Sequence, residues 1–179
     1  MFGRDEKVCS RKPLASLVLL TLLPASILEA GGPARLELAS KERSSALERS
    51  VSDAVRKARA KLADSACREV FSDFRDGSGR TIQENLDALG QSAPEYLGSI
   101  LFYNGAGYSR CDARNTLAST SPSSHVVYIC APQFLEKQRR EPGQAAALII
   151  HEELHSLGLG ENPPDSKEIT ARVIARCGQ

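Results

Sequence analysis

The sequence has no tryptophan and few other aromatic residues, with 5 phenylalanines and 4 tyrosines among 179 residues. It therefore offers little aromatic surface for stacking on nucleic-acid bases or sugars. A strong charge of one sign is also missing, since 23 Lys and Arg against 22 Asp and Glu leave a net charge of +1. Such a chain has no global field that would attract nucleic acid or an anionic membrane. We expect no nucleic-acid partner.

The length and the N-terminal composition indicate one exported domain. With 179 residues and 41% hydrophobic content, the chain can bury one core but is too short for two substantial domains. Residues 1–30 have a basic start, an apolar run and small residues near the end, which is typical of a signal peptide. The apolar stretch 14–28 is interrupted by Pro24 and is shorter than the roughly 20 residues that span a bilayer. We predict a secreted or periplasmic domain over 31–179, with no stable membrane span after signal removal.

The cysteines agree with export. Cys9 lies in the predicted signal peptide, which leaves Cys67, Cys111, Cys130 and Cys177. An even number of cysteines in an oxidising compartment favours two disulfides. Three pairings are open, and we favour Cys111 with Cys130 as a local loop and Cys67 with Cys177 as a tie between the first long helix and the last. No C-x-x-C pair supports a cysteine-ligated metal.

The strongest chemical signal is the pentapeptide His151-Glu152-Glu153-Leu154-His155. Side chains four residues apart lie on one face of an α-helix, so the two imidazoles can converge on one ion. Glu152 lies slightly around the helix and can reach a metal-bound water without ligating the metal. This is the zinc-hydrolase motif, in which zinc lowers the pKa of its water to about 7 and the glutamate accepts a proton. The alternative interpretation is that the match to the motif is a coincidence and that the helix merely carries two histidines on its surface.

The residues before the motif favour a helix. Strong helix formers run from Gln144 to Ile150, directly after the Pro142-Gly143 break. Apolar residues continue through the motif at steps of three and four, which predicts a core-facing stripe beside the histidines. The members of this stripe are Ala147, Ile150, Leu154 and Leu157.

Beyond His155, Gly158 is placed to end the helix, and Glu161 follows three residues later. The run His-Glu-x-x-His-x-x-Gly-x-x-Glu resembles the extended motif of the metzincin clan of zinc peptidases, which has a histidine or, in a few branches, an acidic residue at the last position. The resemblance implies that His151, His155 and Glu161 are the zinc ligands and that Glu152 is the general base.

The resemblance covers about a dozen residues and is incomplete. Metzincins also have a methionine turn beneath the metal, and the only methionine of this chain is Met1. The chain is therefore at most a metzincin-like zincin. The run from His151 to Pro164 also resembles small secreted bacterial proteins of uncharacterised function, and this second resemblance implies no substrate.

Other carboxylates remain candidates for the third ligand. Glu168 is the main rival, because the gluzincin branch of zinc peptidases takes a glutamate from a downstream helix. Asp165 and Glu168 also have the spacing of a helix N-cap and its capping-box partner. Asn162 is a candidate for orienting a ligand through a hydrogen bond, or a simple turn residue.

Together these patterns predict a helix-rich α+β domain with a small sheet and a zincin-like active-site helix. We expect one long helix over 40–74, a short helix over 81–89, and strands over 99–103 and 125–130. The loop 120–124 separates the last strand from what precedes it. In zincins a strand before the active-site helix can pair with an extended substrate, and the resemblance assigns this role to 125–130.

The function expected from these features is a zinc-dependent peptidase with a peptide or protein substrate. Its cofactor would be Zn²⁺, and Glu152 would assist attack of a metal-bound water on the peptide bond. The alternative is a non-catalytic envelope protein with a structural or degenerate metal site. A peptidase also needs a donor to the developing oxyanion. Four side chains remain open for that role: Tyr103, Tyr108, Tyr128 and His125.

Overall fold

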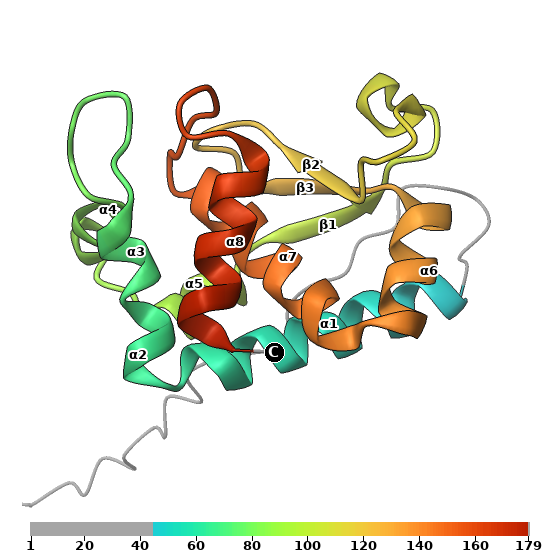
Figure 1. The fold of residues 1–179 in the computed structure, drawn as a ribbon, viewed down its shortest axis with the longest axis horizontal. Helices are drawn as coiled ribbons and strands as arrows, with labels where there is room; N and C mark the ends of the chain where they lie inside the picture. Colours follow the sequence, from blue (N-terminus) through green and yellow to red (C-terminus); the bar gives the residue numbers. More distant parts are fainter. Residues whose placement is uncertain (1–44, 179) are drawn as a thin grey trace, which may run out of the picture.

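The computed structural model describes residues 45–178, so the predicted signal peptide lies outside the described residues. It is a helix-rich α+β fold, as expected (Figure 1). None of the helices within residues 45–178 has the length and the apolar composition that a membrane span requires. The elements in chain order are α1 (Ser45–Leu62), α2 (Ser65–Arg68), α3 (Val70–Asp73), α4 (Ile82–Ala88), α5 (Ala93–Leu97), β1 (Leu101–Asn104), η1 (Ser109–Asp112), β2 (Ala118–Thr120), β3 (Val126–Ile129), α6 (Ala131–Arg140), α7 (Pro142–Ser156) and α8 (Ser166–Cys177).

The single long helix predicted over 40–74 is wrong within the described residues, because α1, α2 and α3 are separate helices. The break follows Leu62, where the Asp64 carboxylate accepts a hydrogen bond from the Ala66 amide and caps α2. Arg68 then donates to the carbonyls of Leu62 and Ala63 at the end of α1. Local side-chain caps satisfy the backbone groups that a continuous helix would have used.

The next elements follow their sequence signals. α4 begins after Thr81, and Thr81 and Glu84 form the reciprocal capping box. Gly90 adopts a φ of 65° just beyond the end of this helix, which is the left-handed conformation that favours glycine. The short helix expected over 81–89 is therefore confirmed.

The sheet has the order β1-β3-β2, with β1 parallel and β2 antiparallel to β3. Both expected strands exist with shifted bounds, but β2 was not predicted, and Thr120 lies in this strand rather than in a loop. The expectation that 125–130 offers a free edge is wrong, because β3 is the central strand. The outer strand on the side of α7 is β2, which packs against that helix.

The helix that carries the pentapeptide, α7, is the most deeply enclosed element of the fold. It packs against α1, α6, α8 and β2. The expected apolar stripe is buried, and so are both histidines and both glutamates of the motif. The motif is thus part of the core and does not lie on a solvated helix surface.

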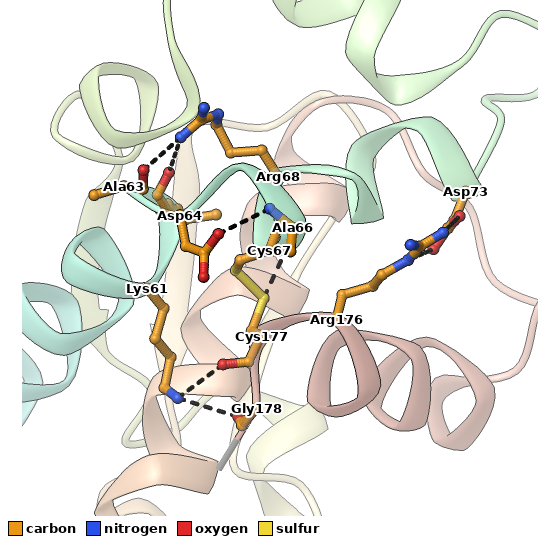
Figure 2. Close-up of a disulfide and its surroundings, with 11 residues drawn as sticks. Lys61, Ala63, Asp64, Ala66, Cys67, Arg68, Asp73, Arg176, Cys177 and Gly178 are labelled. Carbon is orange, nitrogen blue, oxygen red and sulfur yellow. Dashed lines mark hydrogen bonds and ion pairs between the residues drawn. A yellow bond between two sulfur atoms is a disulfide. The ribbon is translucent and has the colours of Figure 1, made fainter.

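The last helix, α8, is fixed to the first part of the chain at its C-terminal end (Figure 2). The disulfide Cys67–Cys177 joins it to α2, and Lys61 donates to the carbonyls of Cys177 and Gly178. Arg176 forms two hydrogen bonds with the Asp73 carboxylate, which lowers the pKa of that carboxyl. The second disulfide joins Cys111 to Cys130, so the favoured pairing is confirmed and indicates an oxidising, extracytoplasmic environment.

Candidate active site

The two motif histidines turn the same ring nitrogen toward each other. The Nε2 atoms of His151 and His155 are 2.9 Å apart, and both rings are buried, at 2% and 5% exposure. Burial and the neighbouring His155 lower the pKa of His151 to about 3. The structure therefore favours neutral His151, which is the form that binds a metal ion.

Glu161 completes the group from the loop between α7 and α8. Its Oε1 lies 3.4 Å from His155 Nε2 and 3.9 Å from His151 Nε2. The three ligand atoms lie within 4.8 Å of one another, and among residues 45–178 this is the one histidine, cysteine and carboxylate group so arranged. Two imidazole nitrogens and one carboxylate oxygen could hold a metal ion, and such a set leaves a coordination position free.

The end of α7 explains how Glu161 comes back to the histidines. Gly158 has a φ of 110°, its amide donates to the His155 carbonyl, and the Leu159 amide donates to the Leu154 carbonyl. This pair of bonds is a Schellman motif, which ends a helix and reverses the chain. The same turn points the Leu159 carbonyl at His155, whose Nδ1 donates to it at 2.7 Å. Because a carbonyl only accepts, His155 carries its proton on Nδ1 and leaves Nε2 free for a metal.

The equivalent support for His151 comes from α8. Thr170 Oγ1 lies 2.9 Å from His151 Nδ1, on a helix 19 residues further along the chain. Both rings are thus fixed at Nδ1, and both expose Nε2 toward the same point. Outer hydrogen bonds of this kind orient metal-binding histidines. No sequence signal marked Thr170, because its role depends on how α8 packs on α7.

Glu152 lies beside the group but binds no part of it directly. Its side chain is 3% exposed, and its Oε2 has no hydrogen-bond partner among the described residues. Burial, followed by the charge of Glu161, raises its pKa to about 8, while a hydrogen bond from the Thr120 backbone and the charge of Arg110 act in the opposite direction. A carboxyl whose pKa lies near neutral pH can both accept and release a proton.

Both His residues, Glu152 and Glu161 line one cleft with a volume of about 920 Å³, which is within the usual range for a ligand site. β2 and the segment that precedes it form one wall, α8 forms another, and α7 contributes Leu148 and the motif side chains. In Figure 1, the loop that contains η1 and helix α8 lie at different ends of β2. All three residues of β2 line the cleft and are buried, so this strand forms part of the cleft wall.

The two other candidates for the third metal ligand, Asp165 and Glu168, lie outside the cleft. Asp165 caps α8, because its carboxylate accepts a hydrogen bond from the Glu168 amide, and neither residue lines the cleft. Asn162 does line the cleft, but the partners of the two imidazoles are Thr170 and Leu159. The expected cap at Asp165 is present.

The four candidate oxyanion donors also lie away from the cleft lining. Tyr108 stacks on Tyr128 with ring centres 4.3 Å apart, and Tyr103 is tilted against the same ring. His125 packs against Tyr96 beside the far end of α7. The cationic residues that the structure brings to the cleft are instead Arg110 and Lys167, and no sequence pattern singled out either of them for a role there.

No protein-family model, curated protein or solved structure significantly matches this chain.

Proposed function

We propose that this protein is a zinc-dependent peptidase that acts outside the cytoplasm, secreted or in a periplasm. The observation that carries the proposal is the pairing of a metal-binding group with a buried carboxyl in one cleft. His151, His155 and Glu161 present three ligand atoms, and Glu152 has an unpartnered oxygen beside them. A buried carboxylate oxygen without a partner is costly to the fold, and its place beside a metal-binding group favours a chemical role.

The donor set suits zinc. Two neutral imidazoles and one carboxylate are typical of catalytic zinc sites, in which a water occupies the fourth position. The Nε2 atoms are 2.9 Å apart. Two nitrogens that bind one tetrahedral zinc ion at about 2.0–2.1 Å are roughly 3.3 Å apart, so a small movement of the rings suffices. Bound zinc would lower the pKa of a coordinated water to about 7 and polarise a peptide carbonyl.

The residues of the chain would supply the proton transfers and the alignment. Glu152 accepts a proton from the attacking water and passes it to the leaving amine. The Thr120 amide holds the Glu152 carboxylate against β2, next to the strand where an extended peptide could add by backbone hydrogen bonds. Thr170 and the Leu159 carbonyl fix the imidazole rings throughout.

The first test compares wild-type protein with Glu152→Gln. Both should bind about one zinc per chain by elemental analysis, because Glu152 is not a ligand in this proposal. Cleavage of a mixed peptide pool, followed by mass spectrometry, should fall about 100-fold to 10,000-fold in the variant. Glu168→Gln, an exposed glutamate outside the cleft, is the matched control and should cleave normally.

Two results would contradict the proposal. Protein that binds no zinc after reconstitution would remove its basis. Zinc bound tightly by a wild-type protein that cleaves no peptide would favour the alternative, a non-catalytic envelope protein with a structural site.

The third ligand has its own test. Glu161→Ala should weaken zinc binding, measured by competition with a chromophoric chelator, by more than tenfold, because it removes one of three protein ligands. Glu168→Ala should leave the affinity unchanged. The reverse order would assign the ligand to Glu168.

A further inference from the structure

The cleft contains two acidic and two basic side chains, and the proposed peptidase chemistry uses only the acidic ones. Four of its lining residues carry a formal charge, namely Glu152, Glu161, Arg110 and Lys167. Both carboxylates are used by the proposed peptidase chemistry, and this inference rests on that function. The two cations are not used by it. Among the described residues, neither Arg110 nor Lys167 has a hydrogen bond or an ion pair to its side chain.

The segment that carries Arg110 is fixed on both sides of this residue. Cys111 forms the disulfide with Cys130 directly after β3, and its amide donates to the Tyr108 carbonyl. Tyr108 stacks on Tyr128 of β3. Gly105 makes room for this arrangement, because a Cβ there would lie 2.5 Å from the Cys111 sulfur. Arg110 is therefore presented to the cleft from a constrained backbone.

The position of Lys167 in the chain is electrostatically unfavourable for a positive charge, so the folded structure gains no stability from it. It lies in the first turn of α8, where the positive end of the helix dipole disfavours a positive charge. Its position on the α8 wall, away from the η1 segment, places the two cations on different elements around the metal-binding group. Arg110 is near enough to Glu152 for its charge to lower the pKa of that carboxyl.

We propose that the cleft selects peptides that carry carboxylate groups, with Arg110 and Lys167 as the residues that determine this specificity. A guanidinium can bind a carboxylate through two parallel hydrogen bonds, and an ammonium attracts it as a point charge. Glu152 and Glu161 are the two acidic residues of the lining, and both have roles in the proposed peptidase chemistry, so the lining offers Arg110 and Lys167 no further acidic side chain. The carboxylate can belong to an internal Glu or Asp or to the C-terminus of the peptide.

The test measures binding separately from cleavage. Fluorescein-labelled peptides, in which one Glu is moved through each position, are compared with the matched Gln series, all with amidated C-termini. One Gln peptide with a free C-terminus distinguishes the second source of a carboxylate. Binding to zinc-loaded Glu152→Gln protein is followed by fluorescence anisotropy. We expect at least one acidic peptide to bind about tenfold more tightly than its neutral partner, and this preference should weaken as salt rises.

Substitutions of Arg110 and Lys167 test whether these two residues cause the preference for acidic peptides. Arg110→Gln and Lys167→Gln should each reduce the preference, and the double variant should abolish it. Arg114→Gln is the matched control, because Arg114 is an exposed arginine of the same segment that does not line the cleft. It should keep the full preference.

The outcomes separate the two proposals. Equal binding of acidic and neutral peptides, or a preference that survives in the double variant, overturns this inference and leaves the peptidase proposal intact. An acidic preference that depends on Arg110 and Lys167, in a wild-type protein that cleaves nothing, supports this inference and rejects the peptidase. No binding of any peptide overturns both.

Discussion

At Gly158 a single backbone conformation connects the helix end to the candidate metal site. Its φ of 110° allows the turn that directs the Leu159 carbonyl to His155. The Asn85 side chain supports the same turn by donating to the Leu157 carbonyl. A residue with a Cβ adopts such a φ only with strain.

We therefore expect Gly158→Ala to lower the free energy of unfolding by about 1–2 kcal/mol in urea titrations of metal-free protein. Zinc affinity, measured by chelator competition, should fall about tenfold because the Leu159 carbonyl shifts. Gly160→Ala is the control in the same loop, since a Cβ at Gly160 meets no atom within 4 Å. Equal effects of the two substitutions would mean that the turn does not position His155.

Some residues of the candidate site could be predicted from the sequence, and others could not. His151, Glu152 and His155 share one helix, so local periodicity places them. Glu161 follows through a short turn that a glycine marks. Thr170 and Arg110 lie on α8 and η1, and they reach the cleft only through packing and a disulfide, for which the chain carries no local pattern.

Helix α7 buries an ionisable side chain, Glu153, that the proposed site does not use. Glu153 is 0% exposed, neither of its carboxylate oxygens has a hydrogen-bond partner among the described residues, and burial raises its pKa well above the usual value. Burial also raises the pKa of Tyr96, and the charge of Glu153 adds to this rise, while the hydrogen bond between the Tyr96 hydroxyl and Ser156 lowers it. Glu153 is therefore a cost to the stability of α7.

Glu153→Met should raise the free energy of unfolding by about 1–3 kcal/mol, because it replaces an unpartnered buried carboxyl with an apolar side chain. Glu153→Gln is the control and should give a smaller gain, since its amide would be equally unpartnered. Urea titration at neutral pH measures both. A loss of stability in Glu153→Met would show that the carboxyl makes a favourable interaction in the folded protein.

The elements themselves were predicted where the signal was local and missed where it was not. The capping box at Thr81 and the apolar stripe of α7 fix their helices. The break after Leu62 depends on Arg68 reaching back to the end of α1, which periodicity does not reveal. β2 has only three residues, too few for an alternating pattern, and it exists because β3 pairs with it.

For the whole molecule, the two disulfides constrain the chain over very different lengths. Cys67–Cys177 closes a separation of 110 residues and holds the end of α8, whereas Cys111–Cys130 closes a separation of 19. In the chain-entropy account, loops of these sizes contribute about 4–5 and about 3 kcal/mol to stability. The longer bridge also acts on the site, because α8 carries Thr170 and Lys167.

Removing the two disulfides one at a time should therefore distinguish effects on stability from effects on zinc affinity and on the preference for acidic peptides. Cys67→Ala with Cys177→Ala should lose the larger free energy of unfolding and also lower zinc affinity, because a looser α8 no longer fixes Thr170 against His151. Cys111→Ala with Cys130→Ala should keep zinc affinity, while the preference for acidic peptides falls because the backbone that carries Arg110 is released. Urea titration, chelator competition and peptide anisotropy measure the three quantities. If both double variants lost zinc affinity equally, the metal site would depend on global stability rather than on the position of α8.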